Sequence, residues 1–272
     1  MAGKAFRFGV VAAAGEGGAK WRETALRAEA LGYSTLLSPD NLNLPTPTAA
    51  LAAAAAVTTE LRVGSFVLAS PLRTARAAAW EAHSLTAVTE GRFELGLGTG
   101  LPSMRQQAGE LGLPYGSGQE RLDSISETVD HVRRLDGDAH TPVMIAAGGP
   151  KARALAAKKA DIVTLAGGPL TTREETAGHL SEIRAEAGSR DLEFAMNIWV
   201  VGERVPPWIR GFLGVDAETL IEHDSLAMLR GGADAMADEL ERRRDELGIS
   251  YFSVNGAFIE EFAPLVARLT GK

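Results

Sequence analysis

The sequence contains no cysteine among its 272 residues. It therefore has no disulfide framework, no thiolate zinc site and no cysteine nucleophile. Basic residues are in the minority too, because 28 Lys and Arg stand against 35 Asp and Glu and the formal net charge is -7. The densest basic run, Arg242-Arg243-Arg244, is flanked by acidic residues, as on the solvated face of a helix. We expect no nucleic-acid partner, because binding to phosphates needs a basic stripe.

Long apolar runs are missing as well. The longest uncharged stretch, Asn41 to Thr59, contains two prolines and four threonines and is mostly alanine, which is too weakly apolar to span a bilayer. Near the N-terminus, Lys4 and Arg7 precede the apolar residues Phe8–Ala14, a faint likeness to a signal peptide. A glycine-containing loop and a helix follow directly, so a first buried strand is the better interpretation. We expect no membrane partner and a cytoplasmic location.

The sequence is built from an alternation of short β-rich apolar runs and amphipathic stretches of helical length. The first pair is Phe6–Val11 and Lys20–Leu31, and the last is Tyr251–Val254 and Phe258–Leu269. About eight such pairs follow one another. Strands that are joined by helices and buried on both faces form a parallel sheet, and eight of them close into a (β/α)8 barrel at this length. The other expected strands are Ser34–Ser38, Leu61–Leu68, Arg92–Gly98, Val143–Ala147, Ile162–Leu165 and Glu193–Val201.

An open doubly wound sheet is the competing α/β architecture. It favours a glycine-rich phosphate turn after the first strand, but Gly15-Glu-Gly-Gly18 lacks the G-x-G-x-x-G spacing. The sequence therefore predicts one domain over residues 1–272 with the fold of a TIM barrel. Residues 202–225, which include Pro206-Pro207-Trp208, break the alternation between the seventh strand and its helix. We expect this insertion to form a lid over the active site.

The active site of such a barrel lies at the carboxyl ends of its strands, where this sequence places few acid–base groups. Asp40 and Glu16 are the carboxylates expected there, the five histidines fall on helices or in connections, and no metal site is expected. No G-x-S-x-G serine elbow is present. Small residues are abundant instead: Gly98-Thr99-Gly100 follows one strand, and Ala146–Pro150 joins another to the N-terminus of a helix, where N–H groups favour phosphate. These loops predict a bound cofactor that supplies the chemistry.

The same residues carry a family resemblance. The sequence resembles the bacterial luciferase-like flavin and deazaflavin oxidoreductases, which are (β/α)8 enzymes, over essentially its whole length. Five segments in the right order carry the resemblance: Ala28–Tyr33 leading into Ser38-Pro-Asp-Asn41, Leu61–Leu68, Gly91–Gly100, Ala146–Arg153 and Ala160–Val163.

The glycine patterns are similar to those of the branch that uses coenzyme F420. The resemblance implies a peptide bulge in the third strand, at Phe66-Val67, that backs the deazaflavin ring. It also implies that backbone amides hold the phosphate and that the Gly-Thr-Gly segment binds the polar edge of the cofactor. Arg73 and Arg121 are candidate contacts for the cofactor tail. The expected cofactor-binding residues are Phe66, Val67, Ser70, Thr99, Gly100, Ala147, Gly148 and Gly149.

Two positions depart from the pattern of this branch. Its members commonly end the second strand in Asp-His, whereas this sequence has Asp40-Asn41, and an asparagine amide does not titrate near neutral pH. The glutamate that some members carry after Gly-Thr-Gly is Leu101 here. We take Asp40 and Asn41 as the candidate catalytic residues, with Glu16, Tyr115 or water as other sources of a proton.

The resemblance leads us to expect an oxidoreductase that transfers a hydride between coenzyme F420 and a small organic substrate. One alternative is an FMN-dependent monooxygenase supplied with reduced flavin by a partner reductase. Another is a protein that binds the cofactor without catalysis. In the insertion, Trp208 is expected to contact an apolar or ring-shaped ligand and Arg210 a carboxylate. A homodimer is also expected, and the alanine-rich helix Thr48–Val57 packs either against a second copy or inside the monomer.

Overall fold

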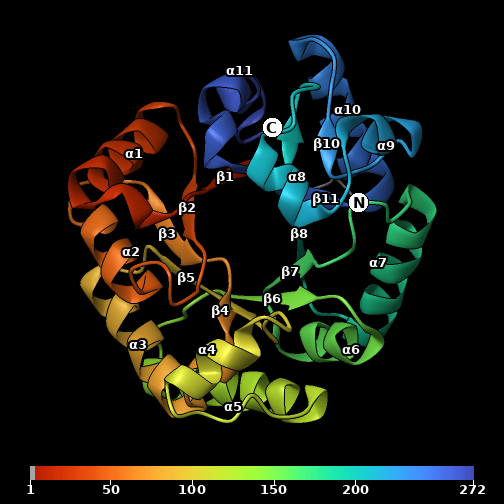
Figure 1. Ribbon diagram of the computed structural model, residues 1–272. Coiled ribbons are helices and arrows are strands. Elements are labelled where there is room, and N and C mark those ends of the chain that lie inside the picture. Colours follow the sequence, from red (N-terminus) through yellow and green to blue (C-terminus); the bar gives the residue numbers. More distant parts are fainter. Residues whose placement is uncertain (1–3) are drawn as a thin grey trace.

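The computed structural model describes residues 4–272, so residues 1–3 of the predicted domain lie outside the described residues. The parallel strands follow the order β3-β2-β1-β11-β8-β7-β6-β5 around a barrel, and a β3–β5 pairing closes the ring. Figure 1 shows this ring with its surrounding helices. The predicted (β/α)8 barrel is confirmed. Its strands are β1 (Arg7–Val11), β2 (Thr35–Ser38), β3 (Arg62–Ser65) continued by β4 (Leu68–Ala69), β5 (Phe93–Gly98), β6 (Val143–Ala147), β7 (Ile162–Leu165), β8 (Glu193–Ile198) and β11 (Ile249–Asn255).

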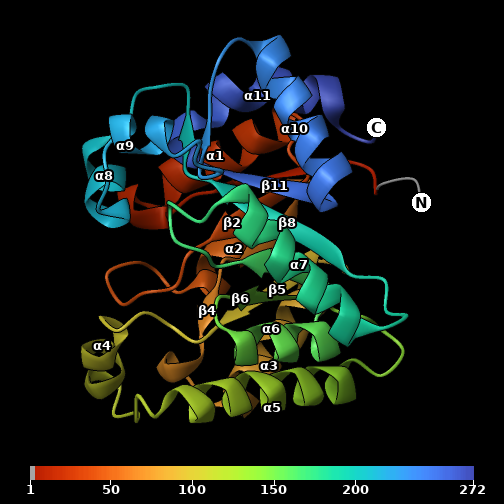
Figure 2. The same cartoon turned by 90° about the vertical axis from the view of Figure 1, so that its right-hand side faces the viewer.

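Helices return the chain between the strands and cover the outside of the barrel (Figure 2). Several begin at a side-chain cap, as where Ser117 and Glu120 form a capping box that satisfies backbone N–H groups of the first turn. None of the helices in residues 4–272 is long and apolar enough to cross a membrane. The helices that follow the barrel strands are α1 (Gly18–Ala30), α2 (Pro47–Ala55), α3 (Ala75–Val88), α5 (Gly118–Asp136), α6 (Pro150–Lys159), α7 (Arg173–Ala187), α10 (Ala233–Leu247) and α11 (Ile259–Leu269).

Two regions differ from the predicted alternation. The loop expected over residues 99–118 contains an additional helix, α4 (Met104–Glu110). The seventh strand, expected over Glu193–Val201, is two separate strands, because the Trp199 N–H donates to the Ala227 carbonyl and the chain leaves the barrel. Beyond this point β9 (Val200–Val201) pairs with β10 (Met228–Leu229) in a small second sheet.

The predicted insertion between the seventh strand and its helix is present. Two short helices, α8 (Pro207–Leu213) and α9 (Ala217–Glu222), occupy residues 202–225, between β9 and β10. In Figure 1 these helices lie over the end of β8, at one side of the barrel mouth. Three short 3-10 turns complete the elements: η1 (Ala14–Glu16), η2 (Ser70–Leu72) and η3 (Gly256–Phe258).

The amino-terminal end of the barrel is filled by ionic side chains. Arg7 donates to Glu193 (Nη2 to Oε2, 2.7 Å) and to Glu94 (Nη1 to Oε1, 2.6 Å), and Arg62 also donates to Glu94. The Arg7 guanidinium lies 3.8 Å from the centre of the Tyr251 ring, which is fully buried. Burial raises the pKa of Tyr251, and the charge of Glu94 raises it further. These groups close the amino-terminal end of the barrel, so a ligand site is expected at the opposite rim, where the strands have their carboxyl ends.

Candidate active site

The third barrel strand is interrupted at the two residues where the family resemblance implied a bulge. The Phe66-Val67 peptide bond lies between β3 and β4 and is cis. The adjacent strand β5 leaves space for it: a Cβ on Gly96 would overlap the Ser65 carbonyl oxygen, and one on Gly98 would lie 2.5 Å from Val67 Cγ2. The Gly-Leu-Gly sequence of β5 is therefore what lets the interrupted strand pack.

Next to this interruption lie Ser70, Thr99 and Gly100. Ala69 of β4 pairs with Gly98 of β5, so Ser70 and Thr99 follow neighbouring strand ends. Among the described residues, the buried Ser70 Oγ has no hydrogen-bond partner. Buried polar atoms are normally paired, so this hydroxyl suits a ligand that supplies the missing partner.

The N-terminus of α6 lies at the same rim. Gly149 is its N-cap, and no side chain caps its first N–H groups, which leaves them suited to bind an anion. A Cβ on Gly148 would lie 3.1 Å from the Ala166 carbonyl oxygen, so a larger residue would crowd this approach. Lys151, in the first turn, adds a positive charge and donates to Gln119. The residues present thus fit the phosphate group of either F420 or FMN.

A cavity opens at the carboxyl ends of β6, β7 and β8, beneath α8 of the insertion. Ala147 and Gly148 line it on the side of α6. Trp199 and Phe212 line it on the side of the insertion, and their rings stack with centroids 4.7 Å apart. The cavity therefore lies between the expected phosphate-binding amides and the insertion.

The insertion approaches this cavity through other side chains than expected. Trp208 and Arg210 are not among the residues that line the cavity, and both are exposed to solvent. Ile209 is the buried residue of α8, and Leu213, one turn further along on the same helix face, reaches the cavity with Phe212. The expected contacts of Trp208 and Arg210 with a ligand stay predictions, and in the structure α8 turns both side chains away from this cavity.

Asp40 and Asn41 do not offer a free acid or base. The buried Asp40 carboxylate accepts from Arg73 Nη1 and Nη2 (2.6 and 3.1 Å) and from the Ala69 N–H (2.9 Å). Burial by itself lowers the pKa of Arg73, but hydrogen bonds and charge from Asp40 raise it above its usual value. The Asn41 side chain accepts the Asn43 N–H inside its own loop. The catalytic role of Asp40 stays a prediction, and in the structure its carboxylate and the Arg73 guanidinium are engaged with each other.

The other expected proton sources are also outside the cavity. Tyr115 donates its hydroxyl to the Leu101 carbonyl (3.1 Å), and its ring lies between the guanidinium groups of Arg105 and Arg121. Glu16 is exposed in η1. Neither Tyr115 nor Glu16 lines the cavity.

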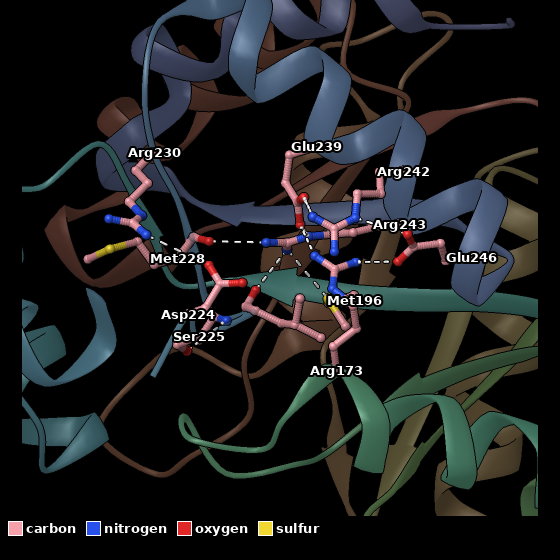
Figure 3. A network of polar contacts seen from close by, with 12 residues as sticks. Arg173, Met196, Asp224, Ser225, Met228, Arg230, Glu239, Arg242, Arg243 and Glu246 are labelled. Carbon is pink, nitrogen blue, oxygen red and sulfur yellow. Dashed lines mark hydrogen bonds and ion pairs between the residues drawn. The ribbon is translucent and has the colours of Figure 1, made fainter. Parts of the chain in front are cut away.

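A polar network fixes the outer wall of the cavity (Figure 3). Arg243 of α10 is buried and donates to the carbonyls of Leu226 (2.8 Å) and Met228 (3.1 Å), and it lies 3.7 Å from Met196 Sδ. Leu226 and Met196 are themselves lining residues. Burial lowers the pKa of Arg243, while Glu239 opposes that effect through a 2.7 Å hydrogen bond. Arg243 therefore anchors the return segment of the insertion to the barrel.

Four polar lining residues were not predicted from the sequence: Thr171 after β7, Thr176 and His179 on α7, and Asn197 on β8. His179 is half-buried, and it was expected to be an ordinary helix-surface residue. The sequence could have indicated this role only through the position of His179 beside the buried face of α7. Within residues 4–272, no group of three or more His, Cys, Asp or Glu side chains could hold a metal ion.

The rim at the carboxyl ends of the strands carries the candidate site of this barrel. A family model described as luciferase-like monooxygenase matches residues 6–202, and the chain belongs to this family. No curated protein sequence matches it.

Solved structures of similar fold include users of both cofactors. An F420-dependent secondary alcohol dehydrogenase, in complex with an F420-acetone adduct, has a TM-score of 0.76 at 21% identity, covering 96% of this chain and 99% of that one. A long-chain alkane monooxygenase has a TM-score of 0.78 at 16% identity, covering 99% and 92%. The oxygenating constituent of 3,6-diketocamphane monooxygenase from Pseudomonas putida, in complex with FMN, has a TM-score of 0.73 at 12% identity, covering 98% of each chain. At these identities the likeness shows the fold.

Proposed function

We propose that the protein transfers a hydride between coenzyme F420 and a small organic substrate. The observation that carries this proposal is the convergence of three features on one rim of the barrel. They are the interruption at Phe66-Val67, the unpartnered Ser70 hydroxyl and the uncapped N-terminus of α6 at Gly149. F420, when bound, supplies the centre that accepts or donates the hydride.

Each part of the rim has a task in this proposal. The amides of Ala147, Gly148 and Gly149 hold the phosphate, because the dipole of α6 and its first N–H groups favour an anion. Phe66 and Val67 back the ring, and Thr99 and Gly100 contact its polar edge. The lid excludes water from the cavity through Phe212.

FMN is the alternative cofactor, since it too carries a phosphate and a flat ring. With FMN, the protein is a monooxygenase that receives reduced flavin from a partner reductase. A protein that binds either cofactor without turnover is the third alternative. Asn41 stands where members of the F420 branch commonly have a histidine, and its amide does not titrate. A protein that binds the cofactor without turnover is therefore worth testing.

A fluorescence titration with F420 and, in parallel, with FMN tests the proposal. We expect micromolar binding of F420 and at least tenfold weaker binding of FMN. A Gly148→Val variant should weaken F420 binding, because the added side chain meets the Ala166 carbonyl. Gly178→Ala, in open space on α7, is the matched control. A preference for FMN would replace the proposal with the monooxygenase, and no binding of either cofactor would reject both.

We also propose that the protein forms a homodimer. Trp80 and Val88 lie eight residues apart on α3, on the same helix face, and are 69% and 71% exposed. The neighbouring α2 adds exposed or half-buried alanines such as Ala49, Ala52 and Ala56. A second copy covering this face would remove a large aromatic side chain from water.

A further inference from the structure

A second cavity lies on the far side of the wall that Arg243 anchors. This wall is the return segment, residues 224–230, which leads from α9 through β10. Leu226 and Ala227 of the return segment line the first cavity, beneath α8. The second cavity has a volume of about 180 Å³ and shares no lining residue with the first. Its polar lining comes from the return segment and α10: Asp224, Ser225, Arg230, Glu239, Arg242 and Arg243.

The arginines at this cavity outnumber the glutamates that pair with them (Figure 3). Glu239 Oε1 accepts from both Arg173 Nη2 (2.6 Å) and Arg243 Nε (2.7 Å). Glu246 accepts from Arg173 (3.2 Å) and from Arg242 (3.0 Å). Three arginines thus share two glutamates, which leaves one positive charge unmatched in a protein whose net charge is -7.

Arg243 is the most enclosed of these cations, at 2% exposed. Besides Glu239, its guanidinium donates to the carbonyls of Leu226 and Met228, which carry no full charge. Buried charges in proteins are normally paired. Burial lowers the pKa of Arg243, Glu239 opposes that effect, and the neighbouring charge of Arg173 lowers the pKa further. The cavity is therefore short of negative charge.

Arg230 and Asp224 face the cavity from the return segment. Within the described part of the chain each has its one ion pair with the other, at 3.7 Å (Nη2 to Oδ1), which is too long for a hydrogen bond. The charge of Asp224 also acts on Arg242 and Arg243, but its side chain is 78% exposed and water competes for it. The Arg230 guanidinium therefore has N–H groups free for another acceptor, and Asp224 is free to turn to solvent.

From this geometry we infer that the second cavity binds a small oxyanion of the phosphate class. The anion accepts hydrogen bonds from Arg230 and Arg242, and it supplies the negative charge that Arg243 lacks. Arg230 follows β10 and Arg242 lies on α10, and they enter the network from opposite sides (Figure 3). A tetrahedral oxyanion presents oxygens in both directions, whereas a planar carboxylate matches a single guanidinium fork. On binding, the anion displaces the Asp224 carboxylate toward solvent.

The anion acts on the wall between the two cavities. On the side of the barrel, backbone bonds hold the return segment: the Ala227 carbonyl accepts the Trp199 N–H, and β10 pairs with β9. On the side of α10, Arg243 holds it through two carbonyls, and the bound anion adds a link between Arg230 and Arg242. The inference does not rest on the proposed function, because the cofactor phosphate is assigned to the N-terminus of α6.

Isothermal titration with sodium phosphate, at an ionic strength held constant with chloride, measures the binding. Wild-type protein should bind phosphate saturably. Arg230→Gln and Arg242→Gln should each weaken the binding about tenfold, as expected for the loss of a charged hydrogen bond. Arg134→Gln makes the same change of charge on exposed surface of α5 and should have no effect. Gly148→Val should also retain this binding, which separates it from an anion at the N-terminus of α6.

A gain of affinity gives the sharpest test, because a misfolded variant does not produce one. Asp224→Asn removes the competing carboxylate and should tighten phosphate binding about threefold, the size of one exposed ion pair. Phenyl phosphate separates the two sources of the anion. Tighter binding than inorganic phosphate assigns the site to the phosphate group of a larger molecule, and equal or weaker binding assigns it to the free ion. If wild-type protein does not bind phosphate, or if the affinity is unchanged in Arg230→Gln and Asp224→Asn, the inference is wrong.

Discussion

Asp40 and Arg73 form a bidentate ion pair that joins the carboxyl end of β2 to the segment after β4. The side chains are 5% and 12% exposed, and the nearer pair of atoms is 2.6 Å apart. The pair lies directly beside the interrupted third strand, so it is part of the scaffold of the candidate site.

Removing one partner of this pair should destabilise the fold. We expect Asp40→Ala to lower the free energy of unfolding by about 3 kcal/mol, because the buried Arg73 keeps only the more distant Glu81 carboxylate (3.7 Å) and the Ala69 N–H loses its acceptor. Chemical denaturation measures the change. The double variant with Arg73→Met should lose less than the sum of the single losses. The exposed pair between Arg27 and Glu260, also bidentate, is the control, and Glu260→Ala should change stability little.

Gly98 should be intolerant of any side chain. A Cβ there would lie 2.5 Å from Val67 Cγ2, so Gly98→Ala must displace the interrupted strand. We expect a loss of about 2 kcal/mol of stability, together with weaker cofactor binding in the fluorescence titration. Gly109→Ala, in α4 with no atom within 4 Å, should be neutral or slightly stabilising. Equal behaviour of the two variants would count against the close packing at Val67.

Glu239 should make the outer wall of the cavity sensitive to acid. Burial tends to raise the pKa of this carboxyl, but hydrogen bonds and charge from Arg243 and Arg173 lower it below the usual 4.5. Because the folded-state pKa is the lower one, the stabilisation is fully present above the unfolded value and is lost as pH falls through the folded value. Glu239→Gln should therefore reduce stability at neutral pH by about 2 kcal/mol and flatten its dependence below about pH 4.5. Thermal unfolding at a series of pH values checks both effects.

Trp80→Glu should convert the proposed dimer to a monomer. The substitution places a charge in the centre of the exposed face of α3, where burial against a second copy would leave it unpaired. Light scattering coupled to size-exclusion chromatography reports the mass. Leu111→Glu changes an exposed apolar residue just after α4, away from this face, and should leave the mass unchanged. A wild-type mass of one chain at all concentrations would reject the dimer.

Most of the barrel could be predicted because its strands are buried on both faces. Each strand then appears as a short apolar segment, and each helix shows apolar residues with a helical spacing of three to four positions. The predicted seventh strand ran too far for the same reason, because Trp199, Val200 and Val201 are apolar and β-rich yet pair with the insertion. The strand with which such an apolar segment pairs depends on tertiary contacts that the local sequence does not encode.

The parts of the candidate site that the backbone forms could be located from the sequence, whereas the parts that depend on the direction of side chains could not. The position of Phe66-Val67 and the glycines of the α6 entrance follow from short local motifs. His179 lies on an ordinary helix, and its access to the cavity depends on how α7 packs. The sequence also did not show that Phe212, and not Trp208, would line the cavity. The burial of Ile209 sets the rotation of α8, and that rotation depends on tertiary packing.

The ionic plug of Arg7, Arg62, Glu94 and Glu193 has a kinetic consequence. It closes one end of the barrel, so every ligand must enter and leave through the other end. A ligand seated deeper at that mouth has to arrive before the one that covers it and depart after it. The architecture therefore favours an ordered sequence of binding and release, set by depth and independent of the affinity of either ligand.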